Sequence, residues 1–165
     1  MVIQADGKIV VSGGEYNGTD LDVLVLRYDV NGTPDDTFGA NGVVIYDSGN
    51  GNDLGRRLSI QSGSKIVVTG RSPNGTDYDV LVLRYNAGGG LDNTFGVNGV
   101  VNFDMGKGND YGEGVVVQAD ARIVISGGSY NGTDYDVLMF RLLVFEGGGG
   151  GSSGGCFIAT VGYGF

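Results

Sequence analysis

An internal repeat with a constant step of 57 residues constrains this chain more than any other feature. Residues 3–13 recur at 60–70 and again at 117–127. Shorter motifs such as Asn-Gly-Thr-Asp follow the same step, without insertion or deletion. A repeat of this kind is one supersecondary unit that needs neighbours to bury its apolar face. We therefore expect an array of equivalent units.

Each period contains four short strand-like runs. In the third unit they are residues 99–103, 114–118, 122–126 and 136–142, separated by turns rich in Gly, Asn and Asp. Asn-Gly and Asp-Gly supply the positive φ of tight hairpin turns, and no helical periodicity is visible. The chain has 34 glycines among 165 residues. We interpret the glycines of the repeats as turn residues.

Several runs are apolar on both faces. In residues 79–85, Val80 and Val82 lie on one face and Leu81 and Leu83 on the other. Such a strand must be covered on both sides. The sequence therefore predicts an all-β, β-propeller-like array of four-stranded antiparallel blades. A β-solenoid and a two-sheet sandwich are the alternatives, and both fit a strict period with four hairpin signals less well.

The length corresponds to about two and a half repeats, so we expect an open arc or a fragment, because closed propellers need about four to eight blades. The predicted division has β repeats over 1–142, a Gly/Ser-rich linker and a tail. The repeat units are 1–41 (partial), 42–98 (full) and 99–142 (full to its last strand), the linker is 143–155, and the tail is 156–165.

Composition excludes several classes of function. With no His and one Cys, the chain has no structural zinc site, no His-based catalytic triad and no internal disulfide. A net charge of −9 argues against nucleic-acid binding. The apolar segment 157–165 is far shorter than the roughly 20 residues that cross a bilayer, so no membrane span is expected.

Pairs of aspartates follow the Asn-Gly turn of every unit. They are Asp20, Asp22, Asp77, Asp79, Asp134 and Asp136. One interpretation is calcium binding, which takes about six to eight oxygens, although the EF-hand spacing is not met. The other is turn capping, with no cofactor. Because the aspartates repeat from unit to unit, we expect no catalytic residues and no enzyme; a glycosidase requires two unequal carboxyl groups at a single site.

Arg27, Arg84 and Arg141 occupy the same strand position in the three units, and each follows an aspartate by five residues. An odd offset places the two side chains on opposite faces of the strand. Each arginine is therefore expected to pair with an acid or a carbonyl on a neighbouring strand or blade, because a buried unpaired charge is costly.

Residues 3–11, 22–28, 31–39 and 41–43 together resemble the delta-60 repeat family of bacterial proteins, and the resemblance extends over residues 1–142. It implies a β-propeller-like repeat of unknown function from secreted or surface proteins. The tail is similar to the CFI box of exported bacterial proteins, in which a Gly-rich run precedes Cys-Phe-Ile-Ala-Thr, here from Cys156 onward. That similarity implies export and makes Cys156 a candidate for processing or anchoring; an unpaired cysteine in an apolar segment is the alternative.

We therefore expect an exported, non-enzymatic β-repeat module at the bacterial surface, with a structural or protein-interaction role. Its partners would be further repeats of the same kind, or a protein or glycan surface. The alternative is a calcium-dependent adhesin module that binds a glycan or a protein.

Overall fold

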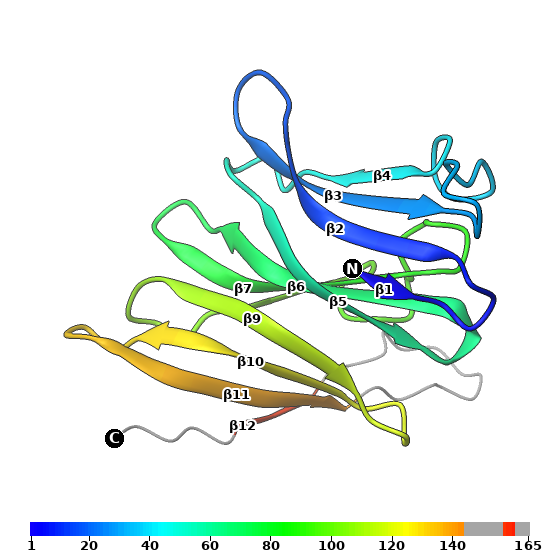
Figure 1. Cartoon of the computed structure of the whole chain (residues 1–165). Helices are drawn as coiled ribbons and strands as arrows, with labels where there is room; N and C mark the ends of the chain where they lie inside the picture. The colour runs from blue at the N-terminus through cyan, green and yellow to red at the C-terminus, as the bar shows by residue number, and fades with distance from the viewer. Residues whose placement is uncertain (144–156, 161–165) are drawn as a thin grey trace.

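The structure is a computed structural model that describes residues 1–143 and 157–160. Within them the chain forms β-strands and one 3₁₀ turn, Ser62–Ser64. The strands make three four-stranded antiparallel sheets that stack as layers of an open arc (Figure 1). The predicted all-β array is therefore confirmed. None of the described residues belongs to a helix with the length and hydropathy needed to cross a bilayer.

Each sheet is a meander in which consecutive strands pair. The first sheet contains β1 (Val2–Ile3), β2 (Ile9–Tyr16), β3 (Leu21–Tyr28) and β4 (Val43–Tyr46). The second contains β5 (Leu54–Gln61), β6 (Lys65–Pro73), β7 (Tyr78–Tyr85) and β8 (Val100–Phe103). The third contains β9 (Asp110–Val117), β10 (Ile123–Tyr130), β11 (Tyr135–Leu143) and β12 (Phe157–Thr160).

The sheets and the sequence units are out of phase. Units 42–98 and 99–142 begin with β4 and β8, yet each of these strands pairs with the last strand of the unit before it. The loop after β3 explains this, because Arg27 N–H donates to the Gly42 carbonyl at 2.8 Å and so holds β4 beside β3. Four strands of one sheet thus come from two successive units, which differs from the expected grouping.

The tail contributes the fourth strand of the third sheet. β12 runs antiparallel to β11, with Thr160 opposite Phe140 and Phe157 opposite Leu143. Part of the predicted tail 156–165 is therefore sheet edge. Cys156 and residues 144–155 of the predicted linker lie outside the described residues.

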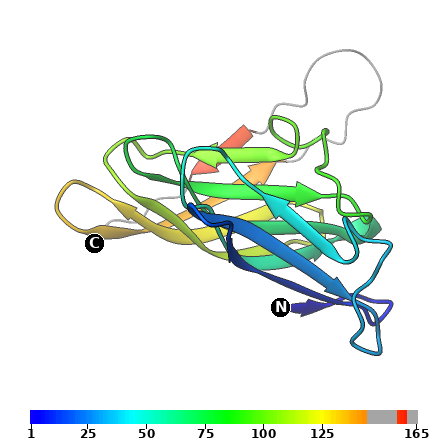
Figure 2. The same ribbon diagram turned by 90° about the horizontal axis from the view of Figure 1, so that it is seen from above.

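Figure 2 shows the stacked strands from above. Two apolar cores fill the spaces between the sheets. Leu81 and Leu83 of β7 lie in the core shared with the first sheet, whereas Val80 and Val82 lie in the core shared with the third. All four are at most 1% exposed. Burial of one such side chain contributes about 1.5–3 kcal/mol, which is why a strand apolar on both faces takes the middle layer. The two-faced pattern predicted from the sequence is confirmed.

Some glycines are required by close backbone approach and have no turn role. A one-residue bulge between Gly55 and Arg57 brings the Leu54 carbonyl against Gly70. A Cβ on Gly70 would lie 1.8 Å from the Leu54 oxygen, and one on Gly127 would lie 1.7 Å from the Tyr111 oxygen. The interpretation of the repeat glycines as turn residues is therefore wrong for Gly70 and Gly127, which lie within strands.

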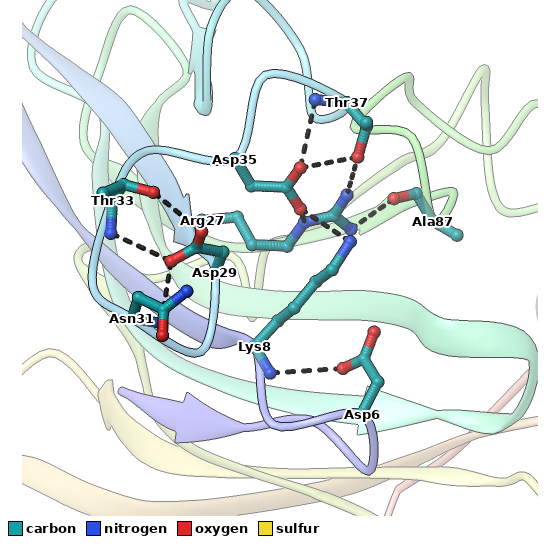
Figure 3. A network of polar contacts seen from close by, with 9 residues as sticks. All are labelled: Asp6, Lys8, Arg27, Asp29, Asn31, Thr33, Asp35, Thr37 and Ala87. Atoms are coloured by element: carbon teal, nitrogen blue, oxygen red, sulfur yellow. Dashed lines mark hydrogen bonds and ion pairs between the residues drawn. The ribbon is translucent and has the colours of Figure 1, made fainter.

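A buried arginine anchors the loop after β3 (Figure 3). Arg27 Nε lies 2.7 Å from Asp35 Oδ2, and its guanidinium also donates to the Ala87 carbonyl of the next unit. Lys8 Nζ lies 2.9 Å from the same Asp35 oxygen. The lysine and Thr37 hydrogen bonds hold the pKa of Asp35 well below its usual range.

The second unit repeats this arrangement. Arg84 is 0% exposed, and its Nε lies 2.9 Å from Asp92 Oδ2. As expected, neither arginine pairs with the aspartate five residues before it. The acidic partner lies in the loop that follows the arginine's own strand and not on a neighbouring strand or blade. The alternation of side chains along a strand does not predict the path of such a loop.

Candidate functional site

Asparagine side chains close the Asn-Gly-Thr-Asp turns. Asn74 Oδ1 accepts hydrogen bonds from the backbone N–H of Thr76 (2.8 Å) and of Asp77 (3.0 Å). Its Nδ2 donates to Asp77 Oδ1 (2.7 Å) and to Asp79 Oδ1 (2.9 Å). The equivalent turns begin at Asn17 and Asn131 and end at Asp20 and Asp134. The first aspartate of each predicted pair thus caps an exposed turn.

The second aspartate of the first pair has a different environment. Asp22 on β3 lies with Asp47, which follows β4, and Asp53, which precedes β5. One carboxylate oxygen from each lies within 4.8 Å of the other two. Asp22 is 5% and Asp53 0% exposed, whereas Asp47 faces solvent.

The same cluster recurs one repeat later. It consists of Asp79 on β7, Asp104 after β8 and Asp110 at the start of β9. One carboxylate oxygen from each again lies within 4.8 Å of the other two. Asp79 is 6% and Asp110 0% exposed. In the described part of the third unit, Asp136 belongs to no such cluster.

Loop amides satisfy only part of each cluster. Ser48 N–H donates to Asp53 Oδ2 at 2.7 Å, and Met105 N–H donates to Asp110 Oδ2 at 2.7 Å. The other carboxylate oxygen, Oδ1, of both Asp53 and Asp110 is buried without a hydrogen bond, as is Oδ1 of Asp22. Buried polar atoms rarely lack a partner, so these oxygens require an explanation.

The electrostatics of the clusters favour a positive charge. Burial raises the pKa of Asp79 to about 6, and the negative charge of Asp104 contributes to the rise. Burial also raises the pKa values of Asp53 and Asp110. The Ser72 hydroxyl beside Asp53 and the Ser129 hydroxyl beside Asp110 oppose these rises, although no hydrogen bond of ordinary geometry reaches Oδ1 of either aspartate.

Sequence reasoning selected Asp22 and Asp79 but missed their companions Asp47, Asp53, Asp104 and Asp110. A signal was present, since residues 47–53 and 104–110 share the motif Asp-x-Gly-x-Gly-Asn-Asp. Along the sequence this motif indicates only a turn. The structure folds the loop back onto β3, where Asp53 N–H donates to the Leu21 carbonyl at 2.6 Å.

A second candidate site is the outer face of the third sheet, which carries Val137 and Met139 and is named the open face. Val23, Val80 and Val137 are equivalent residues of the three sheets, and they are 0%, 0% and 61% exposed. Met139, on the same face, is 40% exposed. A groove of about 580 Å³ lies over this face; residues lining it include Tyr111, Gly127, Tyr135 and Val137.

In the first two sheets, the first strand of the next sheet covers this face. A Cβ on Gly55 of β5 would lie 2.9 Å from Val23 Cγ1. A Cβ on Gly112 of β9 would lie 3.1 Å from Val80 Cγ1 and 2.2 Å from Thr69 Oγ1. A glycine of the following sheet therefore lets two layers approach closely at both junctions.

These features define an open array of four-stranded antiparallel sheets that stack through equivalent residues, as the blades of a β-propeller do. Residues 4–38 and 61–95 match the family described as a domain of unknown function (DUF5122) beta-propeller. The match supports a β-propeller-like repeat family for this chain. Comparison with curated proteins gave no match.

Proposed function

We propose that this chain is an exported, non-enzymatic β-repeat module with a structural or protein-interaction role at the bacterial surface. Its direct partner is a further repeat of the same kind, which docks on the open face. The observation that carries this proposal is the exposure of Val137, because the equivalent valines of the other two sheets are fully buried.

The chain itself indicates what fits the open face. Both covered faces receive a first strand with glycine at its contact point, Gly55 or Gly112. Tyr111 and Glu113, on either side of Gly112 in β9, add further contacts across the second junction. Arg71 stacks over the Tyr111 ring at 5.3 Å, and Arg56 Nη1 lies 3.3 Å from Glu113 Oε1. The occupant we propose is therefore the first strand of another sheet, with glycine at the same position.

The test is to extend the array by one unit. The added unit is a copy of residues 86–142, inserted after Leu142. Leu142 is equivalent to Tyr85 one repeat earlier, so the copy continues the 57-residue period in phase. The loss in the free energy of unfolding caused by Val137→Asp is then measured in the natural and the extended chains by chemical denaturation. We expect a cost below about 1 kcal/mol in the natural chain and above about 3 kcal/mol in the extended chain, where the new sheet would bury the charge.

Val97→Asp is the matched control, because Val97 is 76% exposed and lies outside the open face. It should have the same small effect in both chains. An equal cost of Val137→Asp in the natural and extended chains would show that no repeat docks on this face.

Export rests on the resemblance of the repeats and of the tail to elements of exported bacterial proteins. The corresponding experiment follows a tagged full-length protein in its native cell, by protease treatment of intact cells and by fractionation. If the protein is exported, external protease should digest it in intact cells. Cys156→Ser should change the fraction of the protein that stays with the cells relative to the medium. Complete protection in intact cells, with full digestion after lysis, contradicts export.

A calcium-dependent adhesin for a glycan or protein surface is the second candidate, favoured by the two carboxylate clusters. It predicts that adhesion of the purified chain to bacterial or host surfaces is lost in a chelator and restored by calcium. A module that acts through repeat docking alone shows no such dependence.

A further inference from the structure

We propose that each carboxylate cluster binds one calcium ion, and that the ion clamps two successive sheets together. The first site consists of Asp22, Asp47 and Asp53, and the second of Asp79, Asp104 and Asp110. This inference concerns the junctions inside the array and does not depend on docking at the open face.

The spacing of the oxygens fits a calcium ion. Calcium–oxygen distances are about 2.3–2.6 Å, so two ligand oxygens of one ion can be at most about 5 Å apart. One oxygen from each aspartate lies within 4.8 Å of the others in both clusters. Three carboxylates supply about three to six of the six to eight oxygens that calcium takes.

The buried, unpaired oxygens are an independent observation that points to a ligand. Asp53 and Asp110 are 0% exposed, and Oδ1 of each has no hydrogen bond, although a loop amide holds Oδ2. Oδ1 of Asp22, on the adjacent strand, is also buried and unpaired. A cation among the three carboxylates would satisfy these oxygens and offset their mutual repulsion.

The position of each cluster gives the ion its role. Asp22 belongs to the first sheet, and Asp53 directly precedes the first strand of the second sheet. Asp79 and Asp110 have the same relation to the second and third sheets. An ion at either site would therefore connect two successive sheets and would fix the loop that crosses between them.

The experiment uses the full chain after treatment with a chelator and buffer exchange. Calcium chloride is titrated by calorimetry, and thermal unfolding is followed at each calcium concentration, with sodium chloride at matched ionic strength as a control for screening. We expect two ions per chain and a melting temperature that rises with calcium concentration, because an ion that binds only the folded state stabilises it.

Variants assign the two ions. Asp53→Asn should remove one ion and Asp110→Asn the other, and the double variant should bind none. Asp134→Asn is the matched control, since it removes the same charge from an exposed turn outside both clusters. Without calcium, the Asn variants should melt no lower than the parent, because burial already penalises the charged aspartate.

The unmodified chain decides the matter even if a variant fails to fold. Absence of calcium binding to that chain at millimolar concentration overturns the proposal. Calcium binding that persists unchanged in the folded double variant also overturns it, because the ions would then lie elsewhere.

Discussion

Gly70→Ala tests the close approach of backbones within the second sheet. The new Cβ would lie 1.8 Å from the Leu54 oxygen, whereas real Cβ atoms essentially never come within 3.0 Å of another heavy atom, so the strands must separate by at least 1.2 Å. The obstacle is backbone and cannot rotate away. Overpacking of this kind costs about 1–3 kcal/mol, and weakened hydrogen bonds beside the bulge add about 1 kcal/mol.

We therefore expect Gly70→Ala to lower the free energy of unfolding by about 3 kcal/mol in urea denaturation. For a chain of this size, that corresponds to a fall in melting temperature of roughly 9 °C. Gly13→Ala is the matched control at the same repeat position, because nothing lies within 4 Å of its new Cβ. Equal stability of the two variants would refute the argument from backbone approach.

Two further predictions concern buried charges. Arg84→Met should lower the free energy of unfolding in urea by about 1–3 kcal/mol, because Asp92 loses its buried guanidinium partner but keeps Lys65, whose Nζ lies 3.0 Å from the same oxygen. Arg141→Met, at the equivalent position but without an ion pair among the described residues, should cost much less; similar losses would contradict the role of the pair. The pKa of Asp79, raised by burial to about 6, implies stability that is fully present below about pH 4 and lost as pH rises through 6. In chelator, the melting temperature should therefore fall between pH 5 and pH 7, and less so in Asp79→Asn; a parallel profile for that variant would contradict the assignment.

The sequence predicted the architecture because its strongest signals are local and repeated. Turn motifs and a strand apolar on both faces, such as 79–85, are sufficient to indicate stacked four-stranded sheets. It did not predict that β4 and β8 remain with the sheet before them, because strand pairing depends on the path of a loop. The loop after β3 is held by Arg27 and Asp35, which are close only in the folded chain.

The candidate site was predicted less completely. Asp22 and Asp79 were selected for their repetition, but repetition equally selects turn-capping residues such as Asp20. What distinguishes Asp22 is burial next to Asp53, 31 positions later in the sequence. The importance of Val137 was also invisible, because its sequence environment matches that of the buried Val80 and only the covering layer differs.

The constant step of 57 residues has a genetic consequence. Each of the first two sheets takes strands from two successive units, and both junctions use equivalent residues, including Gly55 and Gly112. A crossover between misaligned copies of the repeat therefore joins equivalent positions wherever it falls within the unit. Such an exchange adds or removes one whole sheet and leaves every remaining junction complementary. We expect related genes to differ in the number of units while the sequence and length of each unit stay nearly constant.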